Sequence, residues 1–219
     1  MVSDFDVQRA FSLLRDEYRY WKTPAVTIVA VCSRSPFKVL VSCIISLRTK
    51  DEVTAAASER LFHAAGTAAE MKELAVEDIA GLIYPCGFYR TKAQQIHDLS
   101  YRLVTDYGGN VPDDIDELLT FKGVGRKTAN LVVTLGYGKP GICVDTHVHR
   151  ICNRWGYVAT KGPDATEMAL RDQLPAGLWL EINDLLVAFG QNHCHPVSPR
   201  CSACCIADMC RRIGVTVSR

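Results

Sequence analysis

The sequence predicts an all-α protein on the basis of helix start signals, helix stop signals and apolar spacing. A serine or threonine followed three residues later by an acidic residue or glutamine is typical of a helix N-terminus, because the two side chains satisfy orphan backbone amides. Such pairs are Ser3 with Asp6, Thr49 with Glu52, Thr67 with Glu70, and Thr91 with Gln94. Glycines that can end a helix are Gly66, Gly108, Gly136, Gly156 and Gly190. Apolar residues recur at helical spacing, and sustained alternation of period two is absent.

Individual helices follow from these patterns in chain order. Two clear apolar stripes are Val7, Ala10, Phe11, Leu14 and Tyr18, then Ile96, Leu99, Leu103 and Tyr107. Residues 25–32 are rich in valine but stand alone before Ser35 and Pro36, a good pair for a helix start, so we interpret them as an extended linker. Residues 37–47 are nearly all apolar, so we expect this helix to be buried on every side at the centre of the fold.

The composition indicates a globular protein. Of its 219 residues, 48% are hydrophobic and 22% are charged, which excludes general disorder. No uncharged apolar stretch reaches the roughly 18 to 20 residues of a membrane span. The N-terminus, with Asp4, Asp6 and Arg9, lacks the order of a signal peptide. We therefore expect a soluble intracellular monomer without a membrane partner, cytoplasmic or nucleoid-associated if the source is a prokaryote.

The net charge of +1 conceals an uneven distribution of charge. Residues 121–150 carry five bases against a single acid, Asp145. The bases are Lys122, Arg126, Lys127, Lys139 and Arg150. This stretch is a candidate anion-binding face, because a polyanion responds to the local patch rather than to the sum of charges.

A Gly-Val-Gly sequence separates an acidic predicted helix from an apolar one. Gly123 and Gly125 permit a tight hairpin whose backbone amides form an anion cradle suited to phosphate. A Walker loop is excluded because Arg126 stands between the glycine and Lys127. A dinucleotide fingerprint is excluded because Thr128 stands where a third glycine is needed. An ordinary helix hairpin, whose glycines only turn the chain, remains as the alternative.

Two residues near this hairpin have chemical potential. Lys127 lies beside Arg126 at a helix N-terminus, surroundings that favour the neutral, nucleophilic amine. A solvated lysine that touches a phosphate is the other interpretation. Asp145 precedes a helical stripe and can cap that helix. Alternatively, its carboxylate accepts the proton of Lys127 and stabilises positive charge that develops on a sugar.

Five of the ten cysteines lie within the last 26 residues. Four of them, Cys194, Cys201, Cys204 and Cys210, follow the spacing Cys-x6-Cys-x2-Cys-x5-Cys. Four thiolates suit either zinc or an iron–sulfur cluster. We favour the cluster, because zinc ribbons usually contain two Cys-x2-Cys pairs and this segment contains one. Cys205 is left outside the set.

Together these motifs resemble the endonuclease III family, the iron–sulfur helix-hairpin-helix DNA glycosylases with lyase activity. The matching segments are Gly123-Val124-Gly125-Arg126-Lys127-Thr128-Ala129, then Val144-Asp145-Thr146-His147, then the cysteine spacing, in the family's order within residues 30–212. The resemblance implies a six-helix barrel domain of residues 24–137. It also implies a second helical domain of residues 1–23 and 138–219, the two domains flanking a DNA-binding cleft.

The resemblance also implies an activity. The family excises oxidised pyrimidines after flipping the damaged base out of duplex DNA. Lys127 would attack the sugar C1′, expel the base and form a Schiff base, and β-elimination at the abasic site would then nick the strand. Asp145 would be the second catalytic residue. The DNA-binding residues would include Gly123, Val124, Gly125 and Arg126, and a [4Fe-4S] cluster would be held by Cys194, Cys201, Cys204 and Cys210.

Three positions add to this resemblance or depart from it. Lys122 replaces the proline that usually precedes the turn, which adds a cation. Arg48 stands where glutamine is common, at the position thought to fill the gap left by the flipped base, and an arginine could pair with the orphan base. Phe88 lies in the segment that wedges into the duplex and could stack in the opened step, although a core phenylalanine is the alternative.

Two other functions compete with the bifunctional glycosylase. A non-catalytic helix-hairpin-helix DNA-binding protein with a structural metal site would bind DNA in a salt-sensitive manner without turnover. An iron–sulfur electron carrier would account for the cysteines, but it leaves the hairpin and Asp145 without a purpose.

Overall fold

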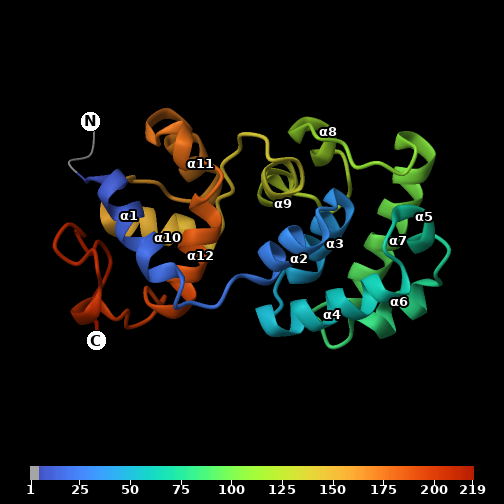
Figure 1. Ribbon diagram of the computed structural model, residues 1–219, viewed down its shortest axis with the longest axis horizontal. Coiled ribbons are helices and arrows are strands. Elements are labelled where there is room, and N and C mark those ends of the chain that lie inside the picture. Colours follow the sequence, from blue (N-terminus) through green and yellow to red (C-terminus); the bar gives the residue numbers. More distant parts are fainter. Residues whose placement is uncertain (1–4) are drawn as a thin grey trace. The chain divides into compact units, whose positions relative to one another are not determined.

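The computed structural model describes residues 5–219, which are helical and contain no β-strand (Figure 1). The all-α prediction is therefore confirmed. The chain divides into two compact units, one formed by residues 25–141 and the other by the N-terminal residues up to 24 together with residues 142–219. Within the described residues, no helix is both long enough and apolar enough to span a membrane.

The unit of residues 25–141 is built around one buried helix. Its elements are α2 (Ala25–Ser33), α3 (Pro36–Ser46), α4 (Asp51–Ala64), α5 (Ala68–Met71), α6 (Val76–Ile83), α7 (Tyr89–Tyr107), α8 (Ile115–Leu119), α9 (Arg126–Leu131) and the π-helical turn η1 (Val132–Gly136). Helix α3 packs against α2, α4, α7, α9 and η1, and Phe37 and residues 39–45 are buried. The expectation of a central buried helix is confirmed up to Ser46, where the helix ends, whereas Leu47 is exposed. Ser35 caps it and Pro36 opens it, as the sequence predicts.

The other unit joins the N-terminal helix to the C-terminal part of the chain. Its elements are α1 (Val7–Tyr18), α10 (Thr146–Trp155), α11 (Pro163–Gln173), the 3-10 turn η2 (Ala176–Leu178), α12 (Ile182–Asn192) and the 3-10 turn η3 (Cys201–Ala203). Helix α12 packs against both α1 and α10. Phe11, Trp155 and Phe189 are fully buried in the core of this unit. The ring of Phe5 stacks on that of Trp155, with the centroids 4.9 Å apart.

The interpretation of residues 25–32 as an extended linker is wrong, because they form α2. The missing local start signal is supplied from a distant part of the chain, since the Ala25 amide donates to the Asp51 carboxylate at 2.9 Å. Ala25, Val26 and Ala30 are buried, and α2 packs on α3. Tertiary burial therefore overrides the low helix propensity of the valines.

The predicted start signals have different outcomes. Thr67 and Glu70 form a complete capping box, as predicted. The pair at Thr49 is wrong, because α4 begins after Lys50 without a side-chain cap. The pair at Thr91 is also wrong, because that residue lies inside α7. Of the pair Ser3 and Asp6, Ser3 lies outside the described residues, and Asp6 is itself the N-cap of α1.

Two of the predicted stop signals end long helices. Gly108 and Gly156 follow α7 and α10 with left-handed backbone, at φ of 60° and 74°. Gly190 instead lies inside α12, where a Cβ atom would come within 2.1 Å of His147 Nδ1. Close packing, rather than a helix end, therefore requires a glycine at that position.

Candidate functional site

The predicted hairpin is present as α8, a short turn and α9. Asp114 caps α8 by accepting hydrogen bonds from the amides of Asp116 and Glu117. Within the turn, Gly123 has a φ of 80°, which favours glycine, and Val124 is buried. Gly125 is the N-cap of α9 and supplies no side-chain cap. The space where its Cβ would lie is open, so a ligand could approach the backbone there.

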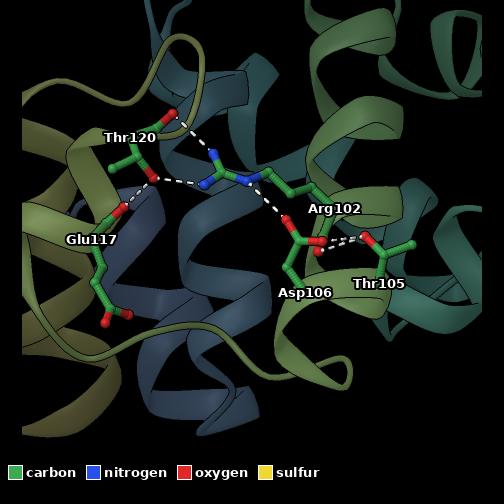
Figure 2. A network of polar contacts seen from close by, with 5 residues as sticks. All are labelled: Arg102, Thr105, Asp106, Glu117 and Thr120. Atoms are coloured by element: carbon green, nitrogen blue, oxygen red, sulfur yellow. Dashed lines mark hydrogen bonds and ion pairs between the residues drawn. The ribbon is translucent and has the colours of Figure 1, made fainter.

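Helix α7 holds the entrance to this turn through Arg102 (Figure 2). The guanidinium donates to the backbone carbonyl and to the hydroxyl of Thr120, each at 2.9 Å. It also lies over the ring of Phe121, with Cζ 4.3 Å from the centroid. Asp106 accepts a third bond from Nε at 3.3 Å and itself accepts from the Thr105 hydroxyl at 2.9 Å. Arg102 is therefore oriented by Asp106 of its own helix while it is hydrogen-bonded to the hairpin.

A second residue of α7 reaches the middle of the turn. The Gln95 side-chain amide donates to the carbonyl of Lys122 at 2.9 Å. A Cβ on Gly123 would lie 1.2 Å from the same amide nitrogen, so Gln95 can approach only because that residue is glycine. The carbonyl of Lys122, and not its side chain, makes this contact. The extra cation at position 122 is therefore compatible with the hairpin and remains exposed.

Lys127 lies in the first turn of α9 and is half-buried. The four residues that follow it, 128–131, are all buried, which fixes α9 against the unit's core. Burial raises the pKa of the Cys43 thiol on α3 to about 12, and the charge of Lys127 opposes that increase. The ammonium therefore lies close enough to the central helix for its field to reach Cys43.

Asp145 belongs to the other unit and is buried at the start of α10. Its Oδ1 accepts from the amides of His147 at 2.8 Å and Val148 at 2.9 Å. The interpretation of Asp145 as a helix cap is therefore confirmed. Both bonds involve Oδ1, so the cap does not use Oδ2. A capping carboxylate held in this way has a fixed orientation and still offers one oxygen for chemistry.

The four cysteines of the C-terminal motif lie around one hollow. Cys194, Cys201, Cys204 and Cys210 all line this hollow, which is partly open to solvent. Cys194 is buried and the other three are partly buried, as is their neighbour Cys205. Within residues 5–219, no group of three or more histidine, cysteine or acidic side chains is placed so that it could hold a metal ion. Four thiols are nevertheless the number and kind of ligand that a [4Fe-4S] cluster requires.

A buried arginine beside this hollow is consistent with an anionic occupant. Arg154 of α10 is only 7% exposed, and it donates to Cys194 Sγ at 3.4 Å and to the carbonyls of His195 and Pro196 at 2.6 Å. In the described part of the chain, no carboxylate is among its hydrogen-bond partners. A buried cation needs a compensating charge, and thiolates around an iron–sulfur core are negative. The residues therefore fit the cluster.

Arg48 and Phe88 are brought together on the unit of residues 25–141. Both residues are exposed, and the Arg48 guanidinium lies 5.6 Å from the centroid of the Phe88 ring. Phe88 is 63% exposed, so the alternative of a core phenylalanine is wrong. Both residues have left-handed backbone, with φ of 52° and 58°. Non-glycine residues rarely adopt this conformation, which is concentrated at functional sites.

Sequence reasoning missed the residues that hold these elements in place. Lys92 is buried and hydrogen-bonded to the segment around Arg48, and Gln95 and Arg102 hold the hairpin. A signal for Lys92 was present. It lies four residues before Ile96, so it continues the buried stripe of its helix at a position where an apolar residue is expected.

Comparison with known proteins identifies relatives over most of the chain. The family described as "HhH-GPD superfamily base excision DNA repair protein" matches residues 41–176. Endonuclease III of Thermotoga maritima is 48% identical over 175 residues, which cover 80% of this chain and 82% of that protein. The resemblance inferred from the motifs is therefore confirmed.

Solved structures agree with the sequence match. A non-covalent complex of endonuclease III with DNA superposes with a TM-score of 0.82 at 31% identity, covering 94% of each chain. A trapped covalent intermediate of endonuclease III with DNA gives a TM-score of 0.76 at 35% identity, covering 81% of this chain and 84% of that chain. The helical fold is thus the one that these DNA complexes contain.

Proposed function

Since the chain belongs to the HhH-GPD superfamily of base excision DNA repair proteins, we propose that it is a DNA glycosylase and abasic-site lyase that removes oxidised pyrimidines from duplex DNA. The observation that supports this most strongly is the position of Lys127. It lies two residues after Gly125, in the first turn of the hairpin's second helix. An amine there is next to the segment best suited to a DNA phosphate.

The hairpin binds the DNA backbone. Gly123, Val124, Gly125 and Arg126 present a tight turn and a cation to one phosphate, without reading the base sequence. Helix α7 holds the turn through Arg102 and Gln95. The lysine that follows is then fixed in position relative to the bound strand.

The reaction is performed by Lys127 and Asp145. The neutral Nζ of Lys127 attacks C1′ of the damaged nucleotide, and the base departs with the electrons of its glycosidic bond. The carboxylate of Asp145 stabilises positive charge on the sugar and takes the proton that the attacking amine loses. Opening of the sugar ring gives a Schiff base. Loss of a proton from C2′ then expels the 3′ phosphate and nicks the strand.

Opening of the duplex falls to Arg48 and Phe88. Arg48 fills the gap that the flipped base leaves and faces the orphan base, and Phe88 stacks in the opened step. Their exposure and their contact with one another support this assignment. The lesion that is preferred depends on this pair, since Arg48 replaces the glutamine that is common in the family.

A [4Fe-4S] cluster would be held by Cys194, Cys201, Cys204 and Cys210, with Arg154 as the neighbouring cation. When bound, the cluster supplies a covalent cross-link for a loop that has little core of its own, and it adds one-electron redox chemistry. Since the substrate is cellular DNA, the protein acts inside the cell.

Borohydride trapping tests the proposal, because reduction of a Schiff base leaves the protein covalently attached to DNA. We expect the wild type to be trapped on duplexes that contain thymine glycol or an abasic site, and Lys127→Ala to give no adduct while it still binds the duplex. Lys72→Ala, at the C-terminal end of α5, is the matched control and is trapped like the wild type.

The other outcomes are equally informative. Trapping on the abasic duplex alone would support the lyase activity and contradict the assignment of oxidised pyrimidines as the excised bases. If the wild type were trapped on neither duplex but bound both in a salt-sensitive manner, the protein would be a non-catalytic DNA-binding module.

A further inference from the structure

The ammonium of Lys92 is the least expected polar group in the unit of residues 25–141. Its side chain is 4% exposed, and Nζ donates to the carbonyls of Ile45 at 2.7 Å and Leu47 at 2.6 Å and to the hydroxyl of Thr49 at 2.9 Å. A lysine ammonium has three donors, and these three bonds use all of them. Burial lowers the pKa of Lys92, which shows that the charged form is held here at a cost.

The acceptors of Lys92 belong to the segment that carries Arg48. Ile45 and Leu47 lie at the C-terminal end of α3, where carbonyls lack partners within the helix and a positive charge is favourable. Arg48 follows immediately with left-handed backbone at a φ of 52°. Lys92 therefore fixes the chain on both sides of Arg48, through Leu47 before it and Thr49 after it.

Thr49 extends the contact to the segment before Phe88. Its Oγ1 accepts from Lys92 and from the Gly87 amide at 3.2 Å, and it donates to the Leu47 carbonyl at 3.3 Å. The two segments lie so close that a Cβ on Gly87 would be 2.6 Å from the carbonyl oxygen of Arg48. Gly87 is therefore required by close approach of the two backbones.

Phe88 belongs to the same rigid helix as the lysine. It is the N-cap of α7, and its carbonyl accepts from the Lys92 amide at 3.0 Å, one turn along the helix. Helix α7 thus presents Phe88 at its start, and Lys92, one turn further along, is hydrogen-bonded to the Arg48 segment. Two strained, exposed residues from separate loops are held by one buried cation.

We propose that Lys92 is a positioning residue for duplex opening, which ties the Arg48 loop to the start of α7 so that Arg48 and Phe88 enter the DNA as one unit. This inference rests on the proposed glycosylase function. An apolar residue at position 92 would continue the buried stripe of α7 without the cost of a buried charge. We attribute the buried charge at this position to its hydrogen bonds, because an apolar side chain could not bind the carbonyls and the hydroxyl that fix these strained backbones.

The test separates opening of the duplex from the chemical step. Single-turnover excision of thymine glycol is measured on a fully paired duplex and on one in which the lesion lies among mismatched pairs, where unstacking is already largely achieved. We expect Lys92→Met to slow excision from the paired duplex by about 10- to 100-fold, the effect of a misplacement of about 1 Å. Excision from the mismatched duplex should slow by less than about threefold.

Two further variants keep the test decisive if Lys92→Met folds poorly. Thr49→Val removes the bridging hydroxyl, and Gly87→Ala pushes the two backbones apart while Lys92 remains. Both should lower the paired rate selectively, whereas Lys72→Met should lower neither rate. Melting followed by circular dichroism identifies any variant whose loss of rate reflects unfolding.

The result that overturns the inference is equal slowing on both duplexes, or no slowing, in folded Lys92, Thr49 and Gly87 variants. That result would leave the glycosylase itself intact. Failure of the wild type to excise thymine glycol from either duplex would instead contradict the proposed function.

Discussion

At the scale of single residues, Asp145 caps a helix with one carboxylate oxygen, while the proposed reaction uses its negative charge. Its Oδ1 satisfies two amides at the start of α10, which holds the side chain in one orientation. Its Oδ2 takes no part in the cap. Removal of the charge and removal of the cap are therefore different changes, and different substitutions at the same position separate them.

We expect Asp145→Asn to keep the fold and lose the reaction. Asparagine is as good an N-cap as aspartate, so the melting temperature should change little. Without the negative charge, excision should slow by about 100-fold or more. Asp145→Ala should also lose the cap and unfold more easily by about 0.5–2 kcal/mol. Single-turnover excision and thermal melting of both variants provide the measurements.

The matched control for Asp145 is Asp6, which caps α1 by accepting from the amide of Arg9 at 2.9 Å. Asp6→Asn should alter neither stability nor rate. Wild-type activity in Asp145→Asn would contradict a chemical role and leave Asp145 as a helix cap alone.

At the scale of elements, α7 positions the candidate site residues that belong to the unit of residues 25–141. Its start presents Phe88, and its first turn holds the Arg48 segment through Lys92. Its middle holds the hairpin through Gln95 and through Arg102, whose contacts Figure 2 shows. Nineteen residues in one helix thus connect the two loops and the turn of the hairpin. A change at Gln95 or Arg102 should therefore act on DNA binding through the hairpin.

Arg102→Met is expected to loosen the hairpin. The substitution removes both hydrogen bonds to Thr120 and the contact with the Phe121 ring. Because the arginine is partly exposed, the loss of stability should be only about 1–2 kcal/mol. Affinity for undamaged duplex should fall by about tenfold, since a mobile turn must be ordered on binding. Fluorescence anisotropy with labelled duplex measures the affinity.

The control for Arg102 is another arginine with two hydrogen bonds to one partner. Arg15 of α1 pairs with the carboxylate of Glu181 in the other unit. Arg15→Met should leave affinity for DNA unchanged. Equal loss of affinity in both variants would show that general destabilisation, and not the hairpin, is responsible.

The elements also show what the sequence could and could not predict. The hairpin and the central helix were predictable because their signals are local: two glycines, a capping serine before proline, and an unbroken apolar run. Helix α2 was not, because its amide cap comes from Asp51, 26 residues away. The hydrogen bonds of Lys92 could not be predicted either, since its three acceptors belong to the end of another helix and the loop beyond it. Contacts between distant segments leave little trace in the periodicity of either one.

At the scale of the whole molecule, each of the two compact units has its own core. The cysteine motif belongs wholly to the unit that contains α1 and α10–α12. All three tryptophans, Trp21, Trp155 and Trp179, belong to that unit as well. Tryptophan fluorescence therefore reports on the unit that would hold the cluster, whereas circular dichroism reports on the helices of both.

Cys204→Ser and Cys205→Ser form a matched pair that tests the ligand set. We expect the wild type to contain about four iron atoms per chain, and Cys204→Ser to lose most of them. A loss of about 2 kcal/mol would lower the fluorescence-detected melting temperature of a unit of this size by roughly 10 °C. Part of the circular dichroism transition should not move, because the unit of residues 25–141 contains no ligand of the cluster.

Cys205→Ser should keep its iron and its melting temperature. Loss of iron from Cys205→Ser instead, or one zinc ion per chain in the wild type, would contradict the assigned cluster while leaving the Lys127 chemistry unaffected.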